Sequence, residues 1–223
     1  TIVVIHPSHH VYLDGCALSG ASAIETPLGN LNVNDNLRTR LLATGKFSIM
    51  EKQVDEEEHS GEMQYPFIQK IIKDAHRTDT VSVLPIMVGS INSMKEAQFG
   101  ELLQPFLAQP GVFTVVSSDF CHWGSRFRFT PTGDNPSMPI HEFIQQLDRR
   151  GMDLIEMKEP GAFAQYLKET SNTICGRHPI GVWLNAMKNV DVKISFVEYA
   201  QSSAAKSKRD SSVSYASAVA QTA

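Results

Sequence analysis

Residues 112–124 read VFTVVSSDFCHWG, and this stretch decides how the chain folds. Its first five residues form an apolar, β-branched run, which is typical of a strand buried on both faces of a sheet. Further strand runs stand at residues 1–5, 81–88 and 192–197, the last with more alternation and so nearer an edge. Helical spacing of apolar residues recurs at 35–44, 62–75, 92–108, 140–157, 162–168 and 180–188. Strands that alternate with helices predict an α/β fold with a mainly parallel sheet.

Local signals refine this prediction. Pro85 lacks a backbone donor and should mark a bulge or an edge position. Ser93 and Glu96 have the spacing of a capping box at the start of a helix. The stretches at 130–139 and 201–212 read as loops rather than linkers, so one domain is predicted over all 223 residues.

Composition narrows the classes of function. The net charge is −4 and the pI is about 6.0, which favours neither nucleic acid nor an anionic membrane as a partner. No apolar run approaches the ~18 residues of a spanning helix. Three scattered cysteines do not make a disulfide scaffold, so a reducing, cytoplasmic setting is expected. Because the chain opens directly on an apolar strand at Thr1, we also expect that residues before it are missing.

Polar side chains follow two of the predicted strands. The first strand run is followed by His9 and His10, and the run quoted above is followed by Asp119 and His122. In open α/β sheets, ligands bind beyond the carboxyl ends of the strands. Two separate strand ends with imidazole and carboxylate groups therefore predict one shared site.

Cys175 precedes a predicted helix and has Arg177 and His178 beside it. Such surroundings favour the thiolate, which is a soft metal ligand and a nucleophile. A free cysteine is more often a small buried hydrophobe, and this interpretation is preferred for Cys16 and Cys121.

The acidic run at 55–62 leads into a predicted helix. Carboxylates at a helix start are favoured by the helix dipole, so most of the run is expected to be solvated capping. His59 and Glu62 share a helix face and could still reach the site. Arg126 and Arg128 are candidates for contacts with an anion, although pairing with local carboxylates is the more ordinary expectation.

These segments together resemble the Memo family. The residues that carry the resemblance are PSHH at 7–10, EHSGEM at 58–63, VVSSDFCHWG at 115–124, NTICGRHPIG at 172–181, YAQSS at 199–203 and DSSVSYA at 210–216. The segments run in chain order from the first residues to the last, so the resemblance covers the whole chain.

The resemblance implies a fold similar to that of the class III extradiol ring-cleaving dioxygenases, an α/β sandwich around a mixed, largely parallel sheet. It also implies a metal-binding vestibule. In it, His9 and Cys175 are metal ligands, Asp119 and His122 are the catalytic candidates, and His59 lies nearby. His10, Glu62, Arg177 and His178 are expected to line this site or to support it.

One departure from the family pattern concerns a further histidine ligand. The family carries it in a Pro-His-Ala-Gly segment on an earlier strand, and this sequence contains no such segment. Either residues outside this sequence supply that ligand, or the metal site is incomplete. His6, where the family usually has glycine, is a weak candidate to replace it.

The residues and the family's known roles together leave three hypotheses open, of which the third is the weakest. The first is a metal-dependent oxidoreductase that uses iron or copper rather than zinc. Cys175 stands where the dioxygenases have a carboxylate ligand, which argues against extradiol ring cleavage.

The second is a cytoplasmic or nuclear signalling adaptor in cell motility, without turnover, that binds a phosphotyrosine-containing peptide of a receptor kinase. Arg126, Arg128 and Arg177 would then contact phosphate. The third is a metal-dependent hydrolase in which Asp119 and His122 activate water.

Overall fold

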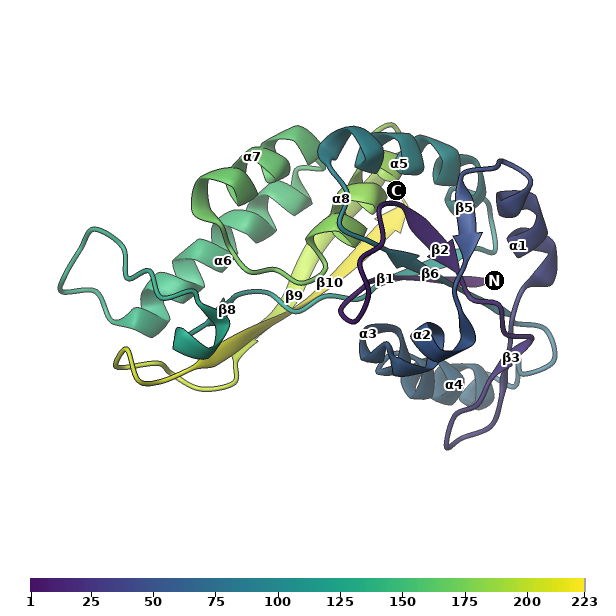
Figure 1. Ribbon diagram of the computed structural model, residues 1–223, viewed down its shortest axis with the longest axis horizontal. Coiled ribbons are helices and arrows are strands. Elements are labelled where there is room, and N and C mark those ends of the chain that lie inside the picture. Colours follow the sequence, from purple (N-terminus) through teal and green to yellow (C-terminus); the bar gives the residue numbers. More distant parts are fainter. Residues whose placement is uncertain (223) are drawn as a thin grey trace.

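The computed structural model describes residues 1–222 and shows a mixed, mostly parallel central sheet (Figure 1). Its strand order is β5-β2-β6-β1-β7. The strands are β1 (Ile2–Pro7), β2 (Cys16–Leu18), β5 (Phe47–Ile49), β6 (Val83–Val88) and β7 (Phe113–Val116). β1 runs parallel to both β6 and β7, whereas β2 is antiparallel to β6. The predicted fold class is confirmed, and the three apolar runs at 1–5, 81–88 and 112–116 are its adjacent strands.

Helices cover both faces of this sheet (Figure 1). Above it in that view lie α5 (Ser93–Leu107) and α8 (Arg177–Met187), and below it lie α2 (Lys52–Glu57), α3 (His59–Glu62) and α4 (Tyr65–Asp74). α1 (Asp35–Leu42) stands beside β5. Because both faces are covered, the side chains of Val3, Val4 and Ile5 are fully buried. Within residues 1–222, no helix is long and apolar enough to cross a lipid bilayer.

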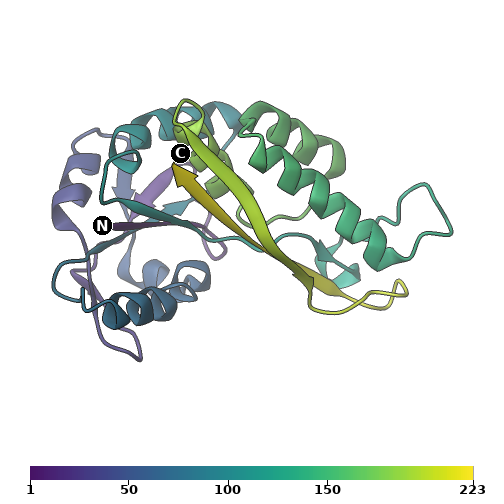
Figure 2. The same ribbon diagram turned by 180° about the vertical axis from the view of Figure 1, so that it is seen from behind.

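A second group of elements extends to one side of the sheet. It contains α6 (Ile140–Glu156), α7 (Pro160–Thr170), the short turn η1 (Ser125–Phe127) and a three-stranded antiparallel sheet, β8 (His122–Trp123), β10 (Ser212–Thr222) and β9 (Val192–Gln201). Figure 2 shows β9 and β10 as one long hairpin that runs away from the central sheet. Trp123, Phe163 and Tyr166 are the large buried side chains of this region, which has its own hydrophobic cluster. A small two-stranded sheet, β3 (Ala23–Ile24) with β4 (Leu31–Asn32), completes the fold.

The strand predicted at 192–197 is confirmed, but it pairs with β10 and not with the central sheet. β10 itself has no apolar run, since its sequence alternates small residues such as Ala and Ser, and the sequence pattern did not predict it. The helix predicted at 62–75 begins earlier, at His59, and is divided into α3 and α4.

The capping box predicted at the start of α5 is wrong. Asn92 is the N-cap, and its Oδ1 accepts from the backbone N–H of Lys95 at 3.0 Å. Ser93 is the first helical residue, and the carboxylate of Glu96 points instead to His178. An asparagine immediately before the helix offers the same acceptor one residue earlier.

Pro85 lies in β6, a central strand, and not at an edge or a bulge as predicted. Its carbonyl accepts from the backbone N–H of Ser19, just past the end of β2 at Leu18. In a strand, the N–H and C=O positions of one residue face the same neighbour. The donor that proline lacks therefore falls where β2 has already ended, and no ladder bond is lost.

Glycine allows α5 and α8 to approach closely. A Cβ atom on Gly100 would lie 2.5 Å from Cβ of Asn185 and 2.9 Å from the carbonyl oxygen of Val182. Both contacts are too short for real atoms, so the two helices would have to separate.

We predict that Gly100→Ala destabilises the protein by about 1–3 kcal/mol, because overpacking outweighs the better helix propensity of alanine. Urea unfolding measures the change. Gly161→Ala in α7 is the matched control, since a Cβ there meets no atom within 4 Å. Equal stability of the two variants would contradict this account of the helix contact.

Candidate functional site

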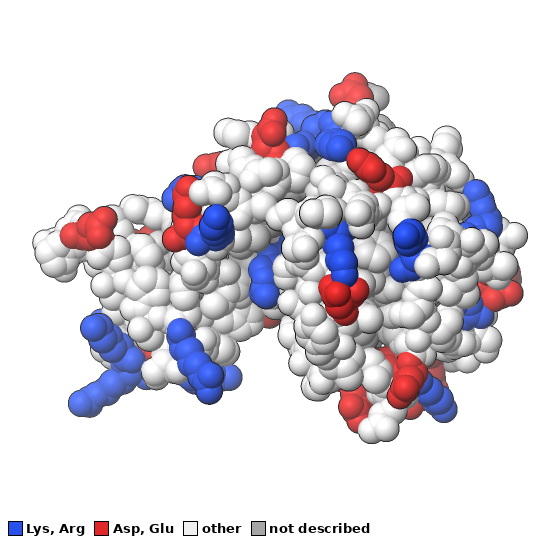
Figure 3. All heavy atoms as spheres, turned by 45° about the horizontal axis from the view of Figure 1, so that its top comes forward, with Lys and Arg blue, Asp and Glu red and all other residues white. Residues whose placement is uncertain are grey.

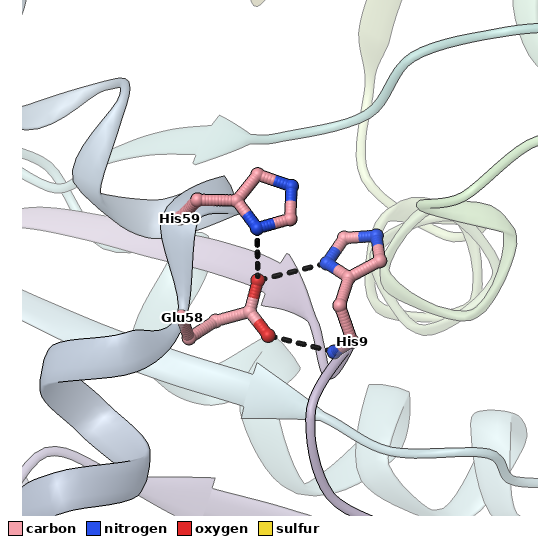
Figure 4. A group of neighbouring side chains, drawn as sticks. All are labelled: His9, Glu58 and His59. Atoms are coloured by element: carbon pink, nitrogen blue, oxygen red, sulfur yellow. Dashed lines mark hydrogen bonds and ion pairs between the residues drawn. The ribbon is translucent and has the colours of Figure 1, made fainter.

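The site begins at a buried carboxylate behind the loop that follows β1. Glu58 Oε2 accepts from the backbone N–H of His9 at 2.6 Å, and Oε1 accepts from His9 Nδ1 at 2.8 Å. Figure 4 shows both contacts, with His59 Nδ1 directed at the same carboxylate from 3.7 Å. The Glu58 side chain is 1% exposed, and it joins two segments that are far apart in the sequence.

Glu58 is held by α3 as well as by His9. As the N-cap of α3 it accepts from Ser60 N at 3.1 Å and from Ser60 Oγ at 2.7 Å. Burial alone would raise the pKa of Glu58, but the hydrogen bonds from His9 and Ser60 outweigh it and hold the pKa well below its usual range. The expectation that the 55–62 run is solvated capping is therefore wrong for Glu58, which caps a helix while buried.

His9 lies between this carboxylate and the thiol of Cys175. The contact with Cys175 and the hydrogen bond with Glu58 raise the pKa of His9 to about 10. Because Nδ1 is bound to Glu58, Nε2 is the ring atom left for the sulfur. The rings of His9 and His59 have centroids 4.6 Å apart, and that of His10 lies 5.9 Å from His59. Three imidazoles thus gather on one side of Glu58.

Cys175 reaches this position from the loop before α8. Its sulfur accepts from the backbone N–H of Asp119 at 3.1 Å, so it lies against the segment that leaves β7. Gly176 makes this possible, since a Cβ there would be 2.4 Å from Cβ of Ser118. The other two cysteines, Cys16 and Cys121, are buried as expected, and burial raises the pKa of both thiols.

His122 and Asp119 extend the site away from Cys175. His122 Nδ1 lies 3.0 Å from the carbonyl oxygen of Phe120 and 3.1 Å from that of Thr173. Carbonyls only accept, so Nδ1 carries a proton and Nε2 of the neutral ring has a free lone pair. Nε2 faces Asp119 Oδ2 at 3.8 Å. This arrangement suits a proton acceptor whose charged form Asp119 stabilises.

The remaining predicted residues are placed differently. Glu62 is exposed on α3, and no hydrogen bond or ion pair within the described residues ties it to the site. Arg126 and Arg128 are exposed, and the Arg126 guanidinium stacks on Phe127, whose ring meets that of His122 at 5.1 Å.

Arg177 and His178 do not join His9 and Cys175. His178 Nδ1 donates to Glu96 Oε1 on α5 at 2.7 Å, and both Arg177 and His178 line a separate cavity. Cys175 is not among the residues that line this cavity.

Sequence reasoning missed Glu58 and Ser60 as parts of the site. Acidic residues before a helix are usually solvated, so nothing in the local pattern distinguished Glu58 from its neighbours. His9, Glu58 and His59 have potential ligand atoms within 4.8 Å of one another and could hold a metal ion.

Comparison with known proteins shows which family and which structures this chain resembles. The family described as Memo-like protein matches residues 1–219. Protein MEMO1 of Homo sapiens is 46% identical over 220 residues, which cover 96% of this chain and 73% of that protein. The memo-1 homolog of Caenorhabditis elegans is 41% identical over 224 residues, which cover 98% of this chain and 63% of that protein. A crystal structure of an uncharacterized protein from Escherichia coli K12 matches with a TM-score of 0.54 at 14% identity, covering 96% of this chain and 85% of that one. This last similarity concerns the fold alone.

Behind the site, His6 is a buried imidazole with an unsatisfied nitrogen. Nδ1 lies 3.1 Å from the carbonyl oxygen of Pro7 and 3.3 Å from Ser60 Oγ, while Nε2 has no partner among the described residues. Burial lowers the pKa of His6 from 6.5 to about 4. The folded protein thus keeps the ring neutral where the unfolded chain protonates it.

We predict that stability falls as the pH is lowered from 6.5 to about 4, because only the unfolded state takes up the His6 proton in that window. The contribution of His6 is on the order of 3 kcal/mol. Urea unfolding of the wild type and of His6→Leu between these pH values measures it, and the difference in slope isolates His6 from other groups. His10→Leu controls for loss of an exposed imidazole. Parallel pH profiles for the wild type and His6→Leu would contradict the prediction.

Proposed function

This chain belongs to the Memo-like protein family, and we propose that it binds iron or copper at His9 and Cys175 and uses the metal in redox chemistry. The position of His9 between the Glu58 carboxylate and the Cys175 thiol carries the proposal. A carboxylate that fixes one ring nitrogen while the other faces a second ligand is the usual support of a metal-binding histidine.

The residues present fit such a metal in their donor chemistry. Imidazole and thiolate together suit copper, iron and zinc, and a redox role restricts the choice to the first two. When bound, the metal would supply one-electron chemistry. Glu58 is better suited to hold His9 than to act as a ligand, since protein donors already occupy both of its oxygens.

His122 and Asp119 would serve the same site by moving a proton. His122 Nε2 has the free lone pair and can accept a proton from a substrate hydroxyl or thiol. Asp119 Oδ2, at 3.8 Å, would stabilise the imidazolium that results. The proton on Nδ1 stays there throughout, hydrogen-bonded to the carbonyl oxygens of Phe120 and Thr173, which keeps the ring fixed.

Metal content distinguishes the two candidate ligand sets, His9 with Cys175 and His9 with Glu58 and His59. We predict that Cys175→Ser loses most of its iron or copper after anaerobic purification, because a hydroxyl is a harder and less acidic ligand than a thiol. His59→Ala should retain the metal. Elemental analysis measures the content, and melting temperatures show that each variant is folded.

His76→Ala, which removes an exposed histidine elsewhere, is the control for these variants. Loss of metal from His59→Ala with retention by Cys175→Ser would overturn the proposed ligands in favour of the group around Glu58.

A change at Glu58 tests its supporting role. Glu58→Gln keeps the shape but removes the charge that orients His9, and we expect metal affinity to fall about 10–100-fold, as is typical on losing a partner of a metal-binding histidine. Competition titration with a chelator measures the affinity. An unchanged affinity would show that Glu58 does not position His9.

A second candidate function is the binding of a phosphotyrosine-containing peptide, as in a signalling adaptor for cell motility in the cytoplasm or nucleus. The observation in its favour is the stack of Arg126 on the ring of Phe127, which in turn meets the His122 ring edge to face and so brings a cation close to the site. Pairing of β8 with β10 brings the turn between β9 and β10 next to η1. The exposed cations of this end are Arg126, Arg128, Lys206, Lys208 and Arg209.

Figure 3 shows Lys and Arg side chains gathered at this protruding end, while both signs of charge alternate over the rest of the visible face. Calorimetric titration of a phosphotyrosine peptide against the wild type and Arg126→Gln tests this function. Binding that needs both the phosphate and Arg126, without consumption of oxygen, would favour the adaptor over the oxidoreductase.

A further inference from the structure

A polar cavity lies on the other side of the segment that carries Cys175. It has a volume of about 480 Å³, within the range of small-molecule sites. Three helix ends enclose it, namely the starts of α5 and α8 and the end of α7. His9, Asp119, His122 and Cys175 are not among its lining residues, so it is distinct from the proposed metal site.

Two cations of this cavity lack a counter-ion. Lys168 and Arg177 both line it, and neither forms an ion pair within residues 1–222. Arg177 Nη1 donates to the carbonyl oxygen of Ile174 at 3.3 Å, which leaves most of its donors unused. Glu96 is the one carboxylate among the lining residues, and His178 holds it at 2.7 Å. With two cations against one carboxylate, the residues that line the cavity carry a net positive charge.

Backbone dipoles add to this charge. Ser93 is the first residue of α5, and Arg177 and His178 are the first two of α8, so both helices begin at the cavity wall. Lys95 N–H is already bonded to Asn92 Oδ1, Arg177 N–H is bonded to the carbonyl of Ile174, and Pro179 has no N–H. It is therefore the positive end of each helix dipole, more than free N–H groups, that favours a negatively charged ligand here.

A buried acceptor also lacks a partner here. Asn172 lines the cavity and is 4% exposed. Its Nδ2 donates into the core, to Asp148 Oδ1 at 3.0 Å and to Tyr166 Oη at 2.8 Å, and its Oδ1 has no hydrogen-bond partner in the structure. A buried amide oxygen without a donor is costly, and a hydroxyl of a ligand would satisfy it.

We propose that this cavity binds the phosphate group of a small hydroxyl-bearing molecule. A phosphate is negatively charged and offers three acceptor oxygens, which suit the donors of Lys168 and Arg177 together with the positive ends of two helix dipoles. A carboxylate has only two acceptor oxygens and would engage fewer of these donors. The hydroxyl of the same molecule would donate to Asn172.

Calorimetric titration of the full chain with inorganic phosphate and with glycerol 3-phosphate, at constant ionic strength, tests the site. Arg177→Gln and Lys168→Met should each weaken binding of glycerol 3-phosphate by about tenfold, as expected when charge-assisted hydrogen bonds are lost. Lys73→Met removes an exposed lysine of α4 and should leave the affinity unchanged. Because Lys168 is exposed, its variant keeps the test decisive if Arg177→Gln fails to fold.

Three results would overturn the proposal. One is the absence of saturable binding at about 10 mM ligand, tenfold above a ~1 mM dissociation constant. Another is equal affinity of the wild type, Lys168→Met and Lys73→Met for glycerol 3-phosphate. The third is binding of inorganic phosphate with none of glycerol 3-phosphate, which would make this a site for the free ion and not for a phosphate ester.

Discussion

The buried charge of Glu58 is the constraint on which the site depends. A carboxylate removed from water is costly unless donors surround it, and here every donor comes from His9 or Ser60. The carboxylate thereby joins the loop after β1 to the start of α3, 49 residues further along the chain. If the His9 ring turned away, this charge would lose its hydrogen bond from Nδ1, which favours the orientation that directs the second ring nitrogen toward Cys175. The nearby His59 ring packs against the imidazole in the same position.

Much of the architecture follows from the sequence alone. Continuous apolar runs distinguished the buried strands β1, β6 and β7, and the position of polar residues after two of them brought His9, Asp119 and His122 to the same region. The sequence pattern did not predict elements and residues whose signal is weak or is the same as that of ordinary surface residues. β10 pairs through its backbone while its small side chains show no apolar run, and Glu58 looks like any acid before a helix. Asn92 and Ser93 both suit an N-cap, and only the structure decides between them.

One short segment, residues 172–178, serves two regions at once. Asn172 anchors it to the core through Asp148 and Tyr166, and Thr173 exchanges hydrogen bonds with the backbone of His122. Close packing of Gly176 on Ser118 then fixes the path of the backbone. As a result, Cys175 faces His9, while Arg177 and His178 line the cavity at the start of α5. The close packing of Gly176 thus determines the directions in which the side chains of Cys175, Arg177 and His178 extend.

The cluster around the central sheet and the cluster around Trp123, the two largest, have a consequence for the protein in solution. The strand that leads to His9 belongs to the first cluster, whereas Phe120, Cys121 and Ile174, which flank Asp119, His122 and Cys175, belong to the second. Trp183 packs against both. The site therefore exists only while both clusters are closed, and its lifetime is set by the one that opens more often. Amide hydrogen exchange measured in each cluster, rather than the global melting temperature, is then the quantity that reports how long the site stays assembled.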